Sequence, residues 1–248
     1  MIYPKMIIFD YGNTLLYEPT FDTLRGEEAV FEHVTVNKKG ITAAQADAFA
    51  QELYAKIGLA RGLGLELHEL QYQKLLYESL GIELSITYQE AERIFWDNAF
   101  GCAVMPGAEK MIDYVNSSGI RSAVISNIGF SGQALTERLT RHLPGNRFEF
   151  VIASSEYGLR KPDPLLFTLA LTKAGLKPKD VWFCGDNIKA DVEGSAGAGI
   201  FPVWYEEKSV DNPWIRENEG LEPNCEHLHI HRWEQLIETL DKLKAAPS

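Results

Sequence analysis

The stretch IIFDYGNTLLYEP, residues 7–19, runs from an apolar segment directly into an aspartate, a glycine and a threonine. Its first three residues form a continuous apolar run, which is typical of a strand buried on both faces of a parallel sheet. Asp10 follows at once, at the carboxyl end of that strand, where ligands bind in open α/β sheets. Two positions later, where a second carboxylate would complete an acid–base pair, there is only Gly12. The stretch therefore predicts a strand that presents a single reactive group, Asp10, as a candidate nucleophile.

Four further apolar runs have the same pattern of buried strands, at 120–126, 148–154, 181–186 and 200–205. Helical patterns lie between or beside them, at about 107–117, 131–142, 163–174 and 189–198. The segment HLHIHRWEQLIETLDKLK, residues 227–244, adds a short strand and an amphipathic helix. Repeated β–α alternation predicts an α/β fold with a doubly wound parallel sheet.

One long segment, residues 17–102, interrupts this alternation. It contains amphipathic helical pieces and no convincing strand. We therefore expect a core domain of residues 1–16 and 103–248, with an inserted all-helical cap domain of residues 17–102 over the carboxyl edge of the sheet.

Composition excludes several classes of partner and location. The 248 residues are 45% hydrophobic and 24% charged, as in ordinary globular proteins, and no apolar run approaches the roughly 18 residues of a membrane span. A net charge of −11 argues against nucleic acid and anionic membranes as partners. The three cysteines are far apart and form no C-x-x-C pair, so we expect reduced thiols and a cytoplasmic location.

Polar residues follow each of the first four predicted core strands. In chain order they are Asp10 and Thr14, then Ser126 and Asn127, then Lys161, then Asp186 and Asp191. The carboxyl ends of parallel strands share one edge of the sheet, so three carboxylates, hydroxyl groups and one lysine are expected to converge there.

The four segments that carry these residues, DYGNT, ISN, RKPDP and GDNIKAD, resemble the motifs of the haloacid dehalogenase-like hydrolase superfamily, in the branch with a helical cap after the first strand. The resemblance covers the core; the cap shares only its placement. It implies a Mg²⁺-dependent phosphatase that acts on a small phosphorylated metabolite through an aspartyl-phosphate on Asp10. Oligomeric state is left open by the sequence.

The resemblance also assigns roles to residues. Mg²⁺ would be bound by Asp10, by the main-chain carbonyl of Gly12 and by Asp186. Asp191 would support the metal without binding it directly. Lys161 would screen the charge between Asp10 and the phosphate. Phosphate oxygens would be bound by Thr14, Ser126, Asn127 and Lys161.

Gly12 departs from the family pattern, which has a second aspartate there that protonates the leaving group and activates water. General acid–base help is worth about 10²–10⁴-fold in rate. A main-chain metal ligand needs no side chain, so metal binding is expected to survive. The departure predicts a slow enzyme, or one restricted to good leaving groups.

Two other functions are compatible with the same fold. One is a metal-independent 2-haloacid dehalogenase. Asp186 and Asp191 argue against it, because acids at these positions have a clear purpose only around a bound cation. The other is a non-catalytic protein that binds a ligand or a protein partner, and Gly12 is its only support in the sequence.

Two further features have simpler interpretations. CEHLHIH, residues 225–231, places Cys225 and three histidines at alternate positions, hence on one face of a strand. A metal site there is an alternative that we do not expect, because the spacing matches no finger or ribbon pattern. Arg160, beside Lys161, is expected to be a surface residue.

Overall fold

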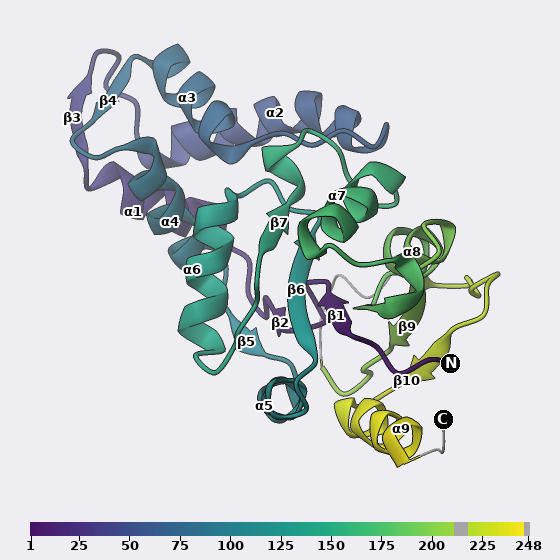
Figure 1. Cartoon of the computed structure of the whole chain (residues 1–248). Helices are drawn as coiled ribbons and strands as arrows, with labels where there is room; N and C mark the ends of the chain where they lie inside the picture. The colour runs from purple at the N-terminus through teal and green to yellow at the C-terminus, as the bar shows by residue number, and fades with distance from the viewer. Residues whose placement is uncertain (211–217, 246–248) are drawn as a thin grey trace.

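A computed structural model describes residues 1–210 and 218–245 and contains a six-stranded parallel sheet at its centre (Figure 1). Its strand order is β10-β9-β8-β1-β6-β7, and every neighbouring pair is parallel. The strands are β1 (Met6–Phe9), β6 (Arg121–Ser126), β7 (Val151–Ala153), β8 (Val181–Gly185), β9 (Phe201–Tyr205) and β10 (Leu228–Ile230). The predicted doubly wound sheet is confirmed, although β7 is shorter than the apolar run 148–154.

Both faces of the sheet are covered by helices. They are α5 (Ala108–Ser117), α6 (Gly132–His142), α7 (Pro164–Ala174), α8 (Gly194–Gly197) and α9 (Trp233–Ala245). Ile7 and Phe9 of β1 pack in the cluster formed with α5, α6 and α9, whereas Met6 and Ile8 pack in the cluster formed with α7. All four side chains are fully buried, because successive residues of a strand point to opposite faces. The continuous apolar run of β1 is thus explained by burial on both faces of the sheet, as the sequence predicted.

The insertion between β1 and β6 consists mainly of four helices, which occupy the upper left of Figure 1. They are α1 (Thr23–Phe31), α2 (Ala43–Arg61), α3 (Glu69–Leu80) and α4 (Tyr88–Ala99), and they pack around an apolar cluster of their own. A short antiparallel ribbon, β3 (Val34–Asn37) with β4 (Ile82–Leu84), joins them. The helical character is confirmed; the ribbon was not predicted, because strands of three and four residues give too short an alternation to recognise.

A second ribbon lies where the chain passes between the insertion and the core. It pairs β2 (Leu16–Tyr17) with β5 (Ala103–Val104) in antiparallel register. The predicted boundary at 16/17 falls inside β2, and the one at 102/103 falls directly before β5. The division into core and cap domains at those residues stays a prediction.

The insertion contacts the loops that follow β6 and β7. Its loop between α2 and α3 places Leu65 in a bridge with Leu159, and the Glu66 and Glu69 amides donate to the carbonyls of Gly158 (3.0 Å) and Gly129 (2.8 Å). These loops leave the carboxyl ends of their strands, so the insertion lies at that edge of the sheet.

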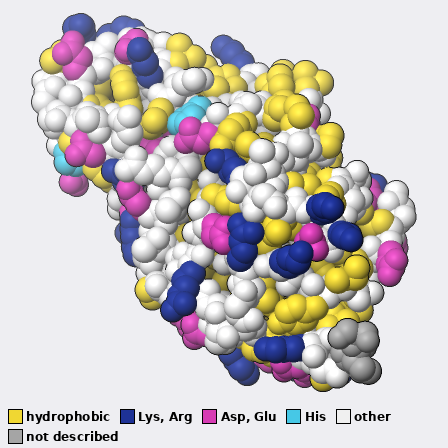
Figure 2. Space-filling model, in the orientation of Figure 1, with side chains coloured by type: hydrophobic (Ala, Val, Ile, Leu, Met, Phe, Trp, Pro, Cys, Tyr) yellow, Lys and Arg dark blue, Asp and Glu magenta, His cyan; other side chains and the backbone are white. Residues whose placement is uncertain are grey.

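The surface mixes side chains of every kind on the face drawn in Figure 2, where Lys and Arg are interspersed with acidic and apolar groups. Within the described part of the chain, no helix is both long and apolar enough to cross a membrane.

Candidate active site

Lys161 and Asp10 form a buried ion pair at the carboxyl end of β1. The Lys161 Nζ lies 2.6 Å from Asp10 Oδ1 and 2.7 Å from Asp191 Oδ1, and it donates to the main-chain oxygen of Ile125 at 2.9 Å. Lys161 thus donates hydrogen bonds to Asp10 and to Ile125, and Asp191 is a second carboxylate at ion-pair distance. Because Lys161 is only 4% exposed, its charge acts on Asp10 and Asp191 with little screening by water.

Asp10, Asp186 and Asp191 bring three carboxylates together. One oxygen of each lies within 4.8 Å of the other two, as the sequence predicted for this edge of the sheet. Burial raises the pKa of Asp10 to about 6; Lys161 opposes this rise, and Asp191 adds to it. The pKa of Asp186 is raised well above its ordinary value by burial and then by Asp191 and Asp10. The single positive charge of Lys161 does not balance the negative charges of three ionised carboxylates.

This donor set fits a magnesium ion. Mg²⁺ prefers oxygen ligands and commonly binds through one or two carboxylates, with water and substrate phosphate completing its shell. A divalent cation among Asp10, Asp186 and Asp191 would favour the ionised forms of the first two, whose pKa values are raised by burial and, to a smaller extent, by neighbouring carboxylates.

Gly12 leaves open space beside these carboxylates. A Cβ atom built on Gly12 would meet no atom within 4 Å, and its φ angle lies outside the left-handed region. Its neighbour Asn13 has a φ of 55°, a conformation that asparagine tolerates better than most residues. The side chain of Asn13 donates to Asp186 Oδ2 at 3.3 Å, a contact that the sequence analysis missed. No other group therefore occupies the space next to the Cβ position of residue 12.

Two hydroxyl residues predicted to bind phosphate, Thr14 and Ser126, are both buried. The Thr14 hydroxyl is fully buried and has no hydrogen-bond partner within the described part of the chain. Buried hydroxyls nearly always have a partner, so this one is suited to a ligand oxygen.

The side chain of Asn127, a residue predicted to bind phosphate, is hydrogen-bonded to the main chain of Lys161. Its amide nitrogen donates to the Lys161 carbonyl (2.8 Å), and its oxygen accepts from the Lys161 main-chain N–H (2.7 Å). Both polar atoms of this side chain are thus engaged with the backbone that carries Lys161, and the phosphate contact of Asn127 stays a prediction. Asn127 therefore acts as a positioning residue for Lys161.

Asp191 is held by the turn that follows β8. A π-helical turn, η3 (Ile188–Glu193), replaces the first part of the α-helix predicted at 189–198, and Asp191 Oδ2 accepts from the Asn187 amide at 3.0 Å. A Cβ atom on Gly185 would lie 2.4 Å from the same oxygen, so only glycine fits there. Asp191 was predicted to support the metal without binding it directly. Its ion pair with Lys161 is an additional finding.

A buried acid joins the insertion to the core next to Lys161. The Glu66 side chain is 1% exposed; it forms ion pairs with Arg160 and with Arg61 (3.1 Å from Nε), and it accepts from the Ser154 hydroxyl (2.9 Å). Arg160 was predicted to be a surface residue, and this is wrong: its side chain is only 20% exposed and is paired with Glu66. A charge pair between segments so far apart in the chain leaves no local sequence signal.

Comparisons with known proteins show the family to which the chain is related. Residues 4–199 match the family model described as haloacid dehalogenase-like hydrolase. The Escherichia coli pyrimidine 5′-nucleotidase YjjG is 27% identical over 235 residues, which cover 93% of this chain and 96% of that protein. The Thermus thermophilus phosphoserine phosphatase is 34% identical over 101 residues, 41% of this chain and 40% of its own length.

A solved structure shows the same fold. The 2-haloacid dehalogenase from Pseudomonas syringae aligns with a TM-score of 0.60 at 19% identity, covering 98% of this chain and 99% of that one. At 19% identity this similarity shows a shared fold and gives no information on activity. The family match spans well over half of the chain and contains all four motifs, so the predicted hydrolase class is confirmed and the chain belongs to the haloacid dehalogenase-like hydrolase family.

Proposed function

We propose that this hydrolase removes the phosphate group from a small phosphorylated metabolite, with Asp10 as nucleophile and Mg²⁺ as cofactor. The observation that carries the proposal is the buried Asp10 carboxylate, which lies 2.6 Å from the Lys161 ammonium and beside Asp186. The relatives named as a nucleotidase and a phosphoserine phosphatase both act, by their names, on phosphorylated small molecules.

The residues suited to hold the metal are Asp10, Asp186 and the main-chain carbonyl of Gly12, with Asp191 close behind. When bound, Mg²⁺ supplies positive charge that offsets the carboxylates and the phosphate oxygens. Asp191 also orients Lys161 through their ion pair of 2.7 Å.

The protein's own groups divide the remaining work. Lys161 holds Asp10 in its ionised form, and it lowers the repulsion between this carboxylate and a phosphate. The hydroxyls of Thr14 and Ser126 bind phosphate oxygens. Asp10 then forms a bond to phosphorus while the bond from phosphorus to the leaving oxygen breaks, and water later releases phosphate from the aspartyl-phosphate.

Gly12 limits the rate of this reaction. Without an acid at that position, the leaving oxygen departs unprotonated or takes its proton from water or from the substrate. Aryl and acyl phosphates tolerate this loss best, because their leaving groups are weak bases. We therefore propose a slow phosphatase with a preference for good leaving groups.

The insertion serves as the cap that covers the substrate. Residues 17–102 contact the loops after β6 and β7, and Glu66 attaches them to Arg160, next to Lys161. A cap in this place excludes water and selects the leaving group. The three cysteines are free thiols, which fits a reducing compartment, and we place the activity in the cytoplasm.

The test is a panel of aryl, acyl and sugar phosphates and nucleoside monophosphates, assayed with Mg²⁺, with EDTA and with Asp10→Asn. We expect phosphate release that requires Mg²⁺ and disappears in the variant. Tight binding without turnover across the panel would instead favour the non-catalytic alternative. Halide release from 2-haloacids that EDTA does not affect would favour the dehalogenase.

A further inference from the structure

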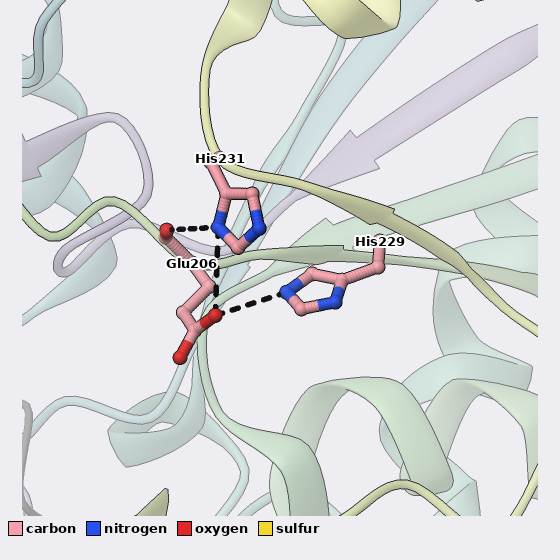
Figure 3. Close-up of side chains that lie close together, drawn as sticks. All are labelled: Glu206, His229 and His231. Carbon is pink, nitrogen blue, oxygen red and sulfur yellow. Dashed lines mark hydrogen bonds and ion pairs between the residues drawn. The ribbon is translucent and has the colours of Figure 1, made fainter.

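Glu206, His229 and His231 form a second cluster of metal-binding side chains, outside the aspartate site (Figure 3). They lie just beyond the end of β9 and in and after β10. The His229 Nε2 is 3.1 Å from Glu206 Oε2, and the His231 Nδ1 is 3.4 Å from the same oxygen. Two imidazole nitrogens thus converge on one carboxylate oxygen.

Strand geometry explains why these residues meet. Alternate residues of a strand share a face, so His229 and His231 point to the same side. The parallel register pairs His229 with Trp204 and Ile230 with Tyr205, which places Glu206 beside His231. The cluster is therefore built into the sheet.

The distances suit a tetrahedral zinc ion. Zinc–nitrogen and zinc–oxygen bonds of about 2.0–2.1 Å place neighbouring ligands of a tetrahedron about 3.3 Å apart. The separations of 3.1 and 3.4 Å bracket that value. The His231 Nδ1 also lies 3.0 Å from the main-chain oxygen of Glu206, at hydrogen-bond distance.

The ring of His229 is held in place by an aromatic neighbour. Trp204 stacks on His229 with centroids 3.9 Å apart and an interplanar angle of 13°. Imidazole binds metal ions through the lone pair of a ring nitrogen, and the His229 Nε2 faces the Glu206 carboxylate. Trp204 also donates to the main-chain oxygen of Asp186 (3.1 Å), which connects this cluster to the catalytic edge of the sheet.

One cation competes for the carboxylate. The Lys208 Nζ lies 3.1 Å from Glu206 Oε1, whereas the two histidines face Oε2. Lys208 thus leaves the second oxygen available, but its positive charge opposes a metal ion nearby.

From this arrangement we propose that Glu206, His229 and His231 form a zinc site, separate from the magnesium site at Asp10. Two nitrogens and a carboxylate are the donors that a borderline metal such as Zn²⁺ selects, whereas the three-aspartate site offers oxygen alone. No metal was expected in CEHLHIH, because its ligand spacing matches no finger or ribbon pattern; the third ligand, Glu206, follows another strand, so spacing within that segment does not reveal it. His227 lies outside the cluster, with its Nδ1 2.8 Å from the Cys225 carbonyl.

Histidine NMR tests the site directly, because the aspartate site holds no imidazole. Full-length protein labelled with ¹⁵N-histidine is titrated with Zn²⁺ in excess Mg²⁺, which saturates the oxygen site. We expect one equivalent of Zn²⁺ to shift the ring nitrogens of His229 and His231 and to leave His33, His68 and His142 unchanged.

Variants then separate this site from general zinc binding. His229→Ala and His231→Ala are each expected to weaken Zn²⁺ binding by about tenfold or more, and Lys208→Ala to strengthen it. His142→Ala, a histidine outside the cluster, is expected to bind as the unchanged protein does. Glu206→Gln serves as a further test if a histidine variant fails to fold. Unshifted His229 and His231 resonances, or full zinc affinity in folded His229→Ala, would overturn the proposal.

Discussion

Gly12→Asp is the substitution that most sharply probes the catalytic deficit. Open space surrounds the Cβ position of Gly12 to at least 4 Å, and the backbone there is not left-handed. The Cβ atom of an aspartate therefore meets no neighbour, and the backbone conformation accepts a side chain. The new carboxyl group would lie beside Asp10 and Asp186, where a leaving-group acid is needed.

The expected gain follows from the electrostatics of the site. Two carboxylates about 6 Å apart repel by about 3 kcal/mol at an effective dielectric constant of about 20, and this repulsion raises the pKa of the added acid. Such an acid stays protonated to a higher pH than an ordinary aspartate, as a proton donor requires. General acid catalysis then predicts a rise in kcat/KM of about 10²–10⁴-fold for alkyl phosphates.

The assay compares an alkyl phosphate with p-nitrophenyl phosphate at saturating Mg²⁺. The alkyl substrate should gain most, because its leaving oxygen is a strong base, whereas p-nitrophenolate leaves readily without a proton. Gly12→Asn is the matched control: it has the same shape and no acidic proton, so it should give no gain. Equal rates for Gly12→Asp and Gly12→Asn on the alkyl substrate, in folded proteins, would refute the reasoning.

Three further substitutions test packing, docking and buried charge. Gly185→Ala would drive a Cβ atom into Asp191, so we expect about 1–3 kcal/mol of destabilisation in urea unfolding and a lower kcat; unchanged stability would contradict the close contact. Glu66→Ala removes the buried partner of Arg160, so amide exchange at 64–69 should accelerate; exchange equal to that of the unchanged protein would show that Glu66 does not attach the insertion. Glu27 accepts from Tyr77, and burial raises its pKa from 4.5 to about 7, so its ionised form destabilises the fold increasingly as pH rises between those values. Glu27→Gln should therefore gain about 3 kcal/mol in urea unfolding at about pH 8 and little at about pH 4; a gain equal at both would contradict the pKa assignment.

The sequence predicted those parts of the molecule that have a local signal. The apolar run before Asp10 indicated a strand buried on both faces, and residues of β1 do pack alternately into two clusters. Asp10, Lys161, Asp186 and Asp191 each follow a strand, and the shared edge of a parallel sheet is sufficient to bring them together.

Other features depend on contacts between distant segments. The pairing of β3 with β4 joins residues that are more than 40 positions apart, as the partners Asn37 and Ile82 show, and each strand alone is too short to recognise. The buried pair of Glu66 and Arg160 is equally non-local.

Side-chain direction was the remaining limit. Asn127 follows its strand where predicted, yet its amide is turned to the Lys161 backbone, which position along the chain does not reveal. The histidines in residues 227–231 alternate along the chain. The carboxylate that His229 and His231 face belongs to Glu206, which follows the neighbouring strand.

Trapping of the covalent intermediate tests the central claim most directly. The protein is mixed with p-nitrophenyl phosphate and Mg²⁺, reduced with borohydride during turnover, digested, and analysed by peptide mass spectrometry. Borohydride converts an aspartyl-phosphate to homoserine, so we predict homoserine at Asp10, and none when EDTA is present or substrate is omitted. Phosphate release with Asp10 unmodified, or homoserine at Asp186 instead, would contradict the assignment of Asp10 as the nucleophile.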